Sequence, residues 1–149
     1  MTPFKRVKAW VDALALSGVR LPTSLPEILK LNYALIREES EEALESISLL
    51  EHDILMMEEV NIRHGIVEIA KELADTIVVC NHLFAQLGID GDIVTNIVTN
   101  NNDKKLTDPS RHLNAIGKIV LSPEAKAELK REVYRDLDSY IGGVYQYMG

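Results

Sequence analysis

The sequence predicts an all-α protein, a helical bundle of about five helices. Aromatic residues form only 5% of the chain although 46% of it is hydrophobic, so the core must consist mostly of Leu, Ile, Val and Ala, which suit packed helices. No Gly or Pro interrupts residues 27–60, a stretch rich in Leu, Glu and Ala, all of which favour helix. The apolar residues of this stretch recur with helical period, which indicates a helix with one face toward a core.

Four helices are predicted in the first two thirds of the chain. Their ranges are 4–16, about 26–60, about 65–87 and about 90–102. Gly18 ends the first helix, a break near Gly65 separates the second from the third, and Gly88 ends the third. Asp90 and Asp92 stand at the start of the fourth, where acidic groups suit the positive end of the helix dipole.

The remaining third is predicted to hold a loop and one more helix. A polar loop covers residues 100–110, and a short extended piece is predicted at 116–121. The segment Ser122-Pro123-Glu124 has the features of a helix start, with an N-cap hydroxyl, a Pro in the first position and an acid against the dipole. The final helix is predicted to reach about Tyr147. No internal repeat divides the chain, so a single domain is predicted for residues 1–149.

The charge and the cysteine content narrow the class of protein. A net charge of −7 argues against binding to nucleic acid, which needs a basic surface, and against binding to an anionic membrane. The single cysteine, Cys80, excludes an intrachain disulfide. Asp12 interrupts the apolar N-terminal stretch, and no run of apolar residues approaches a membrane span. We therefore expect a soluble, cytoplasmic protein without a nucleic-acid or membrane partner.

Two acidic residues of the second helix do not follow its amphipathic pattern. At about 100° per residue, Glu39 falls close to the centre of the apolar sector, and Glu42 falls at the edge of that sector. The third helix carries a matching pair, because Glu72 and Asp75 are also three residues apart and share a face. Each pair taken alone is compatible with a solvated helix face. If the two helices pack antiparallel, however, the four carboxylates converge and form a site of hard oxygen ligands for Mg²⁺ or Mn²⁺.

These acidic pairs resemble the signature of a known superfamily. The run Glu38-Glu39-Ser40-Glu41-Glu42 fits E-E-x-x-E, and the run Lys71-Glu72-Leu73-Ala74-Asp75-Thr76 contains E-x-x-D. In this order the two motifs resemble those of the all-α nucleotide pyrophosphohydrolases, which include MazG-like proteins, dimeric dUTPases and phosphoribosyl-ATP pyrophosphohydrolases. The resemblance is clearest over residues 30–105.

The resemblance implies a fold, an activity and a set of site residues. It implies a four-helix catalytic core, a homodimer or a dimer of dimers, and Mg²⁺-dependent cleavage of a nucleoside triphosphate between the α and β phosphates. The products are a nucleoside monophosphate and pyrophosphate, as in the removal of unwanted nucleotides from the pool. Three roles are carried over by position: metal ligands at Glu39, Glu42, Glu72 and Asp75; positioning or deprotonation of water at Glu38 and Glu39; and phosphate contacts at Asn96, Asn100, Lys104 and Lys105.

Two alternatives stay open at the level of the sequence. One is a phosphoribosyl-ATP pyrophosphohydrolase, which uses the same chemistry but is more compact than this chain. The other is a non-catalytic helical assembly module that has kept the fold. The residues do not indicate which base or sugar is preferred, since the base pocket of such folds is built from variable side chains.

Overall fold

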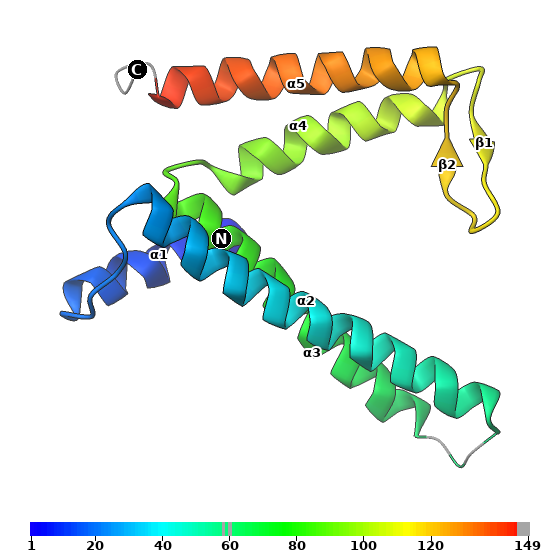
Figure 1. Cartoon of the computed structure of the whole chain (residues 1–149), viewed down its shortest axis with the longest axis horizontal. Coiled ribbons are helices and arrows are strands. Elements are labelled where there is room, and N and C mark those ends of the chain that lie inside the picture. Colours follow the sequence, from blue (N-terminus) through cyan, green and yellow to red (C-terminus); the bar gives the residue numbers. More distant parts are fainter. Residues whose placement is uncertain (58, 60, 146–149) are drawn as a thin grey trace. The chain divides into compact units, whose positions relative to one another are not determined.

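The computed structural model describes residues 1–57, 59 and 61–145. In this part of the chain it contains five α-helices, one short 3-10 helix and one hairpin of two-residue strands, which confirms the all-α class (Figure 1). The chain divides into two compact units, Met1–Leu87 and Gly88–Gly149. The single domain over 1–149 stays a prediction.

The first unit begins with α1 (Pro3–Leu16), which packs against α3. Thr2 caps this helix, because its hydroxyl accepts a hydrogen bond from the Lys5 amide, and Pro3 occupies the first position. One side of α1 is buried through Phe4, Val7 and Val11, which recur at the helical spacing that the sequence shows.

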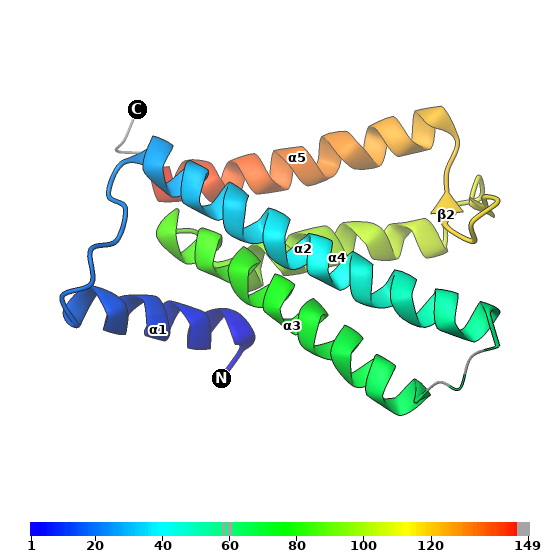
Figure 2. The same ribbon diagram turned by 60° about the horizontal axis from the view of Figure 1, so that its bottom comes forward.

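The long helices α2 (Leu25–Leu55) and α3 (Ile62–Gln86) form an antiparallel pair that makes up most of the first unit (Figures 1 and 2). Ser24 caps α2 and Asn61 caps α3, each by accepting a hydrogen bond from an amide three residues on. Ala43 is only 4% exposed, whereas Ile47 and Ile54 on the same side of α2 are 40% and 49% exposed. The neighbouring helix therefore covers only part of the apolar sector that the sequence predicts.

The turn between these helices differs from the predicted one. The second helix ends at Leu55 rather than near residue 60. Met57 has a positive φ of 55°, and the sequence contains no Gly or Pro next to it that would indicate such a conformation. Gly65 lies inside α3 instead of in the turn. A Cβ built at this glycine would stand 2.7 Å from Leu50 Cδ1, so the glycine permits close packing of α3 against α2.

A buried polar network joins α2 to α3 near the other end of the pair. Asn32 is fully buried, and its side-chain amide donates to the Ile28 carbonyl and to Gln86 Oε1. His82 Nδ1 lies 2.9 Å from Asn32 Oδ1, which requires the tautomer with a proton on Nδ1. The ring of Trp10 on α1 contacts the His82 ring at 6.2 Å between centroids, so the network connects all three helices of this unit.

The second unit consists of α4 (Gly91–Asp103), the 3-10 helix η1 (Lys104–Leu106), strands β1 (His112–Leu113) and β2 (Ile119–Val120), and α5 (Pro123–Tyr145). Helix α4 packs against α5, and the two strands pair antiparallel. Within the predicted extended piece, only residues 119–120 are strand. The Ser122 hydroxyl accepts a hydrogen bond from the Ala125 amide at the start of α5, as the sequence indicates. The predicted end near Tyr147 lies outside the described residues.

Among the described residues, no single helix is long and apolar enough to cross a membrane. Only α3 together with the Gly91–Leu106 stretch, as a bent pair, meets the requirement for length and composition.

Candidate metal site

Three of the four predicted metal ligands meet between α2 and α3. Glu39 extends from α2, Glu72 and Asp75 extend from α3, and one carboxylate oxygen of each lies within 4.8 Å of the others. The three-residue spacing places Glu72 and Asp75 on one face of α3, and the antiparallel packing of the helices brings Glu39 against that face. The structure thus contains an acidic cluster that could hold a metal ion.

The cluster is partly removed from solvent. Glu72 is only 8% exposed, and Glu39 is half-buried. The Oε2 atoms of Glu39 and Glu72 are both buried and have no hydrogen-bond partner among the described protein atoms. Leaving a buried polar atom unpaired costs about 1–3 kcal/mol, and more for a charged group. Because both atoms belong to the same cluster, a cation bound there would satisfy them together.

One basic side chain already contacts the cluster. Lys71 Nζ lies 2.9 Å from Asp75 Oδ2 and 3.1 Å from Glu72 Oε1. A hydrogen bond with Asp75, and a weaker contribution from a hydrogen bond with Glu72, raise the pKa of Lys71. The negative charges of these two carboxylates also raise it. A single ammonium against three carboxylates leaves an excess of negative charge. No role was predicted for Lys71 from the sequence, although its position four residues before Asp75 is typical of a helical ion pair.

The fourth predicted ligand, Glu42, lies beside this trio rather than within it. Its side chain is exposed. Partial desolvation raises the pKa of Glu42, as do a hydrogen bond with Glu72 and the charges of Glu72, Glu39 and Glu38. These neighbours favour either a proton on Glu42 or a cation nearby. Glu42 therefore lies next to Glu72 but outside the trio, and its role as a metal ligand stays a prediction.

Glu38, a predicted catalytic residue, is exposed on α2. Together with Arg37, Glu41 and Glu42 it borders a shallow, open depression on the outer side of this helix. Arg37 Nε pairs with Glu41 at 2.8 Å. The charge of Glu38 acts on Glu42, so Glu38 is near the acidic cluster without belonging to it.

Thr76 fixes the two helices at the level of the cluster. Its Oγ1 lies 3.0 Å from the Glu72 carbonyl oxygen in its own helix and 3.2 Å from the Glu39 carbonyl oxygen on α2. The main chain that carries Glu39 is thus held beside the main chain that carries Glu72. This contact of Thr76 could not be predicted from the sequence, because helical periodicity does not show which hydroxyl reaches a neighbouring helix.

The four predicted phosphate contacts belong to the second unit. Asn96 and Asn100 are exposed on α4. Lys104 Nζ pairs with Glu132 Oε2 at 2.6 Å, and this hydrogen bond lowers the pKa of Glu132. Lys105 is half-buried and lines a pocket between α4 and α5. Their role toward a phosphate stays a prediction.

Neither a comparison with protein-family models nor a comparison with curated proteins found a match for this chain. The acidic cluster is therefore the feature of this chain that points to a function. Three carboxylates, two of which carry a buried unpaired oxygen, provide a hard, anionic donor set, which suits Mg²⁺ with several of its waters retained. The same set is a poor match for metals that prefer thiolate or imidazole ligands.

Proposed function

We propose that this protein is a Mg²⁺-dependent pyrophosphohydrolase of nucleoside triphosphates. In this proposal it cleaves between the α and β phosphates and releases a nucleoside monophosphate and pyrophosphate. The observation that carries the proposal is the meeting of Glu39, Glu72 and Asp75, with a buried unpaired oxygen on each of the two glutamates. The order of the two acidic motifs along the chain supports it, since nucleotide pyrophosphohydrolases share this pattern.

The cluster suits the chemistry that such a reaction needs. A triphosphate carries several negative charges, and this chain has a net charge of −7, so direct binding to its acidic surface is unfavourable. A Mg²⁺ ion held at the cluster would supply charge neutralisation on the phosphates and Lewis-acid activation. Glu39, Glu72 and Asp75 would hold the ion, and Glu42 would complete the set.

In this proposal Glu39 or Glu38 would also orient or deprotonate the attacking water. Glu39 belongs to the acidic cluster and is half-buried, so its carboxylate would lie next to the bound ion. Glu38 lies on the next position of α2 and is exposed, where it could orient that water from the solvent side. Thr76 keeps these groups in register, because it holds the main chain of Glu39 against that of Glu72.

The proposal is tested with a panel of canonical and modified nucleoside triphosphates in the presence of Mg²⁺, with pyrophosphate and orthophosphate measured separately. We expect release of pyrophosphate that requires the metal, and loss of this release in Glu72→Gln and Asp75→Asn. Glu51→Gln is the matched control, since Glu51 is an exposed acid on α2 outside the cluster. Wild-type rates in both cluster variants would refute the assignment, and release of orthophosphate alone would place the cleavage elsewhere.

Two further readouts separate the alternatives. Phosphoribosyl-ATP belongs in the panel, because selective turnover of this compound would identify the related pyrophosphohydrolase. A protein that shows no turnover and no thermal shift with Mg²⁺ and nucleotide would be a helical assembly module instead, since a ligand that binds only the native state stabilises it.

We also propose that the chain forms a homodimer or a dimer of dimers. Large apolar side chains on α2 and α3 support this, because Leu44 is 66% exposed and Ile77 is 54% exposed. Light scattering coupled to size exclusion would measure the mass, and a monomer at micromolar concentration would contradict the proposal.

A further inference from the structure

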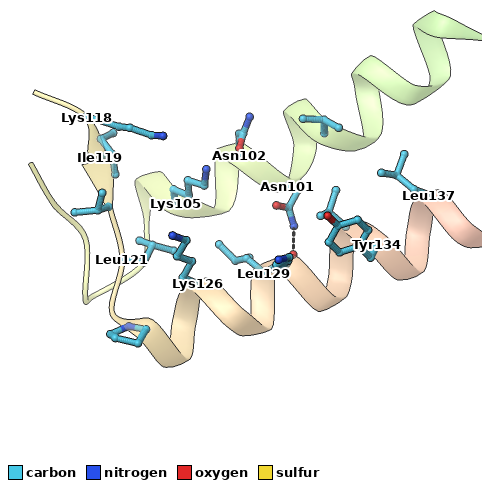
Figure 3. Close-up of a pocket in the computed structure, with 15 residues that line it drawn as sticks. Asn101, Asn102, Lys105, Lys118, Ile119, Leu121, Lys126, Leu129, Tyr134 and Leu137 are labelled. Carbon is cyan, nitrogen blue, oxygen red and sulfur yellow. Dashed lines mark hydrogen bonds between the residues drawn. The ribbon is translucent and has the colours of Figure 1, made fainter. Parts of the chain in front are cut away.

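The second unit contains a pocket of about 650 Å³ between α4 and α5, bordered at one end by β2 (Figure 3). Its walls are largely apolar and come from α4, β2 and α5; they include Val98, Ile119, Leu121, Leu129, Val133 and Leu137. Asn101 is only 9% exposed, and its side-chain amide donates to the Leu129 carbonyl at 3.0 Å. This bond joins α4 to α5 at two residues that line the pocket.

All the charged residues that line this pocket are lysines. They are Lys105, Lys118, Lys126 and Lys130. The segment Gly88–Gly149 has eight basic and nine acidic residues, so its charges nearly balance. Half of its basic residues thus border one pocket, and none of its acidic residues does. The charged groups that line the pocket are therefore all positive, although the whole chain has a net charge of −7.

Three of these lysines lack an acidic partner. In the part of the chain that the structure describes, no ion pair involves Lys105, Lys118 or Lys126. Lys104, directly before Lys105, pairs with Glu132 at 2.6 Å. Lys130 lies over the Tyr134 ring at 5.6 Å from its centroid. Because they have no ion-pair partner among the described residues, the ammonium groups of Lys105, Lys118 and Lys126 can pair with an anion from outside the chain.

The charged and the apolar groups are separated along the pocket. Figure 3 shows Lys105, Lys118 and Lys126 gathered at the end next to the hairpin, with Tyr134 and Leu137 at the opposite end. An anion bound among the lysines would leave space along the helices for an apolar group. A fully polar ligand would make no favourable contacts with the apolar walls, and a neutral apolar ligand would leave the ammonium groups of the lysines without a negatively charged partner.

We infer that this pocket binds a small amphipathic anion, with its acidic head group among Lys105, Lys118 and Lys126 and its apolar tail between α4 and α5. The volume lies within the range of about 300–1,000 Å³ that small-molecule sites occupy. Ammonium groups form strong charge-assisted hydrogen bonds with carboxylate and phosphate oxygens alike. The inference concerns the second unit alone and does not depend on the metal site.

Binding of octanoate and octyl phosphate to the full chain, measured by isothermal titration calorimetry, tests the inference. Both probes share the tail, so their relative affinity tells a carboxylate ligand from a phosphate ligand. We expect at least one of them to bind about tenfold or more tightly than 1-octanol or inorganic phosphate, which each lack one half of the recognised chemistry. Equal binding of octanol would overturn the inference, because the lysines would then have no role, and so would no binding of either probe.

Charge reversal locates the binding site. Lys118→Glu and Lys126→Glu should each weaken binding of the better probe by about tenfold or more. Arg131→Glu is the matched control, because it makes the same charge change on an exposed residue of α5 that does not line the pocket. Circular dichroism verifies that each variant is folded. Unchanged binding in both lysine variants, or equal weakening in the control, would overturn the inference.

A competition arm separates this site from the proposed enzymatic one, since Lys105 is also a predicted phosphate contact. We expect Asp75→Asn to bind the probe as the wild type does, and a nucleoside triphosphate with Mg²⁺ to leave the bound probe in place. If the nucleotide displaces the probe and both need Lys118 and Lys126, the pocket belongs to the nucleotide, and a separate amphipathic ligand is refuted.

Discussion

The Thr76 hydroxyl on α3 lies 3.2 Å from the main-chain oxygen of Glu39 on α2. This contact joins the two helices at the residue that carries one of the three clustered carboxylates. The contact involves the main chain, so it sets the position of Glu39 along the helix axis relative to Glu72 rather than the rotamer of either side chain. A small shift of one helix along the other would separate the oxygens that lie within 4.8 Å.

Thr76→Val should therefore weaken Mg²⁺ binding although Thr76 is not a ligand. The variant keeps the shape of the side chain and removes the hydroxyl, which also lowers the free energy of unfolding by about 1 kcal/mol. Thr76→Ser keeps the hydroxyl and should restore the affinity for Mg²⁺. Calorimetry with the metal and urea unfolding without it measure the two effects. A Thr76→Val protein that loses stability but keeps full Mg²⁺ affinity would show that the hydroxyl has only a structural role.

The second prediction concerns the unpaired glutamates. Without metal, Glu39→Gln should raise the melting temperature, because it removes one of three repelling carboxylates and a buried charged oxygen without a partner. With Mg²⁺, the wild type should gain about 1.4 kcal/mol when the free ion is at ten times its dissociation constant, and the variant should gain much less.

Thermal melts at increasing Mg²⁺ concentration compare the melting temperatures of the wild type and Glu39→Gln. Glu51→Gln serves as the control, and its melting temperature should follow that of the wild type at every concentration. If Glu39→Gln lowered the melting temperature in both conditions, the carboxylate would be stabilising the metal-free protein. The cluster would then not be a site under repulsion.

The helical period explains how much of the metal site could be predicted. Once residues 27–55 are helical, Glu39 must fall near the apolar sector, and Glu72 and Asp75 must share a face of α3. The antiparallel packing then brings them together. Lys71 was missed, since a long flexible side chain can turn toward either neighbour, and periodicity does not say which.

The parts that could not be predicted depend on contacts between segments distant in sequence. Met57 adopts a positive φ in the turn after α2, and methionine has no preference for this conformation from which it could be predicted. The pairing of His112 with Val120 involves strands of two residues, too short for an alternating pattern to be visible. Likewise, the convergence of Lys105, Lys118 and Lys126 on one pocket requires η1, the hairpin and α5 to be placed together.

The third prediction is a pH dependence of stability that arises from His82. Burial lowers the pKa of this imidazole, and its Nδ1 proton is donated to Asn32. Between the folded pKa and the unfolded value of about 6.5, the unfolded state binds more protons than the folded state, so stability rises with pH. The contribution is therefore fully present above about pH 7 and is lost as the pH falls through the folded pKa.

Urea unfolding at pH 5 and pH 7.5 measures this loss, and His82→Gln should reduce the difference between the two values. The control is His64→Gln, because the His64 side chain is 69% exposed and should leave the pH dependence as it is. A wild-type dependence that persisted in His82→Gln would assign it to another group.

The fourth prediction concerns Gly65, where α3 approaches Leu50 of α2. Gly65→Ala should destabilise the fold by about 1 kcal/mol, since its Cβ would stand 2.7 Å from Leu50 Cδ1 and force that side chain to move. Gly142→Ala is the matched control in α5, where a Cβ meets nothing within 4 Å. It should stabilise the protein by about 0.5–1 kcal/mol through helix propensity alone. Equal stabilisation by both substitutions would show that the helices do not need the glycine.

The last prediction follows from the position of Lys71. Its ammonium group contacts both Glu72 and Asp75, so it competes with a metal ion for the same oxygens and repels a divalent cation. Lys71→Met keeps the length of the side chain and removes the charge, and it should tighten Mg²⁺ binding several-fold, whereas Lys71→Arg should not. Calorimetry at low and high salt measures both affinities, and the difference between the two variants should shrink as salt screens the charge. Weaker Mg²⁺ binding in Lys71→Met would mean that the lysine orders the carboxylates for the metal instead of opposing it.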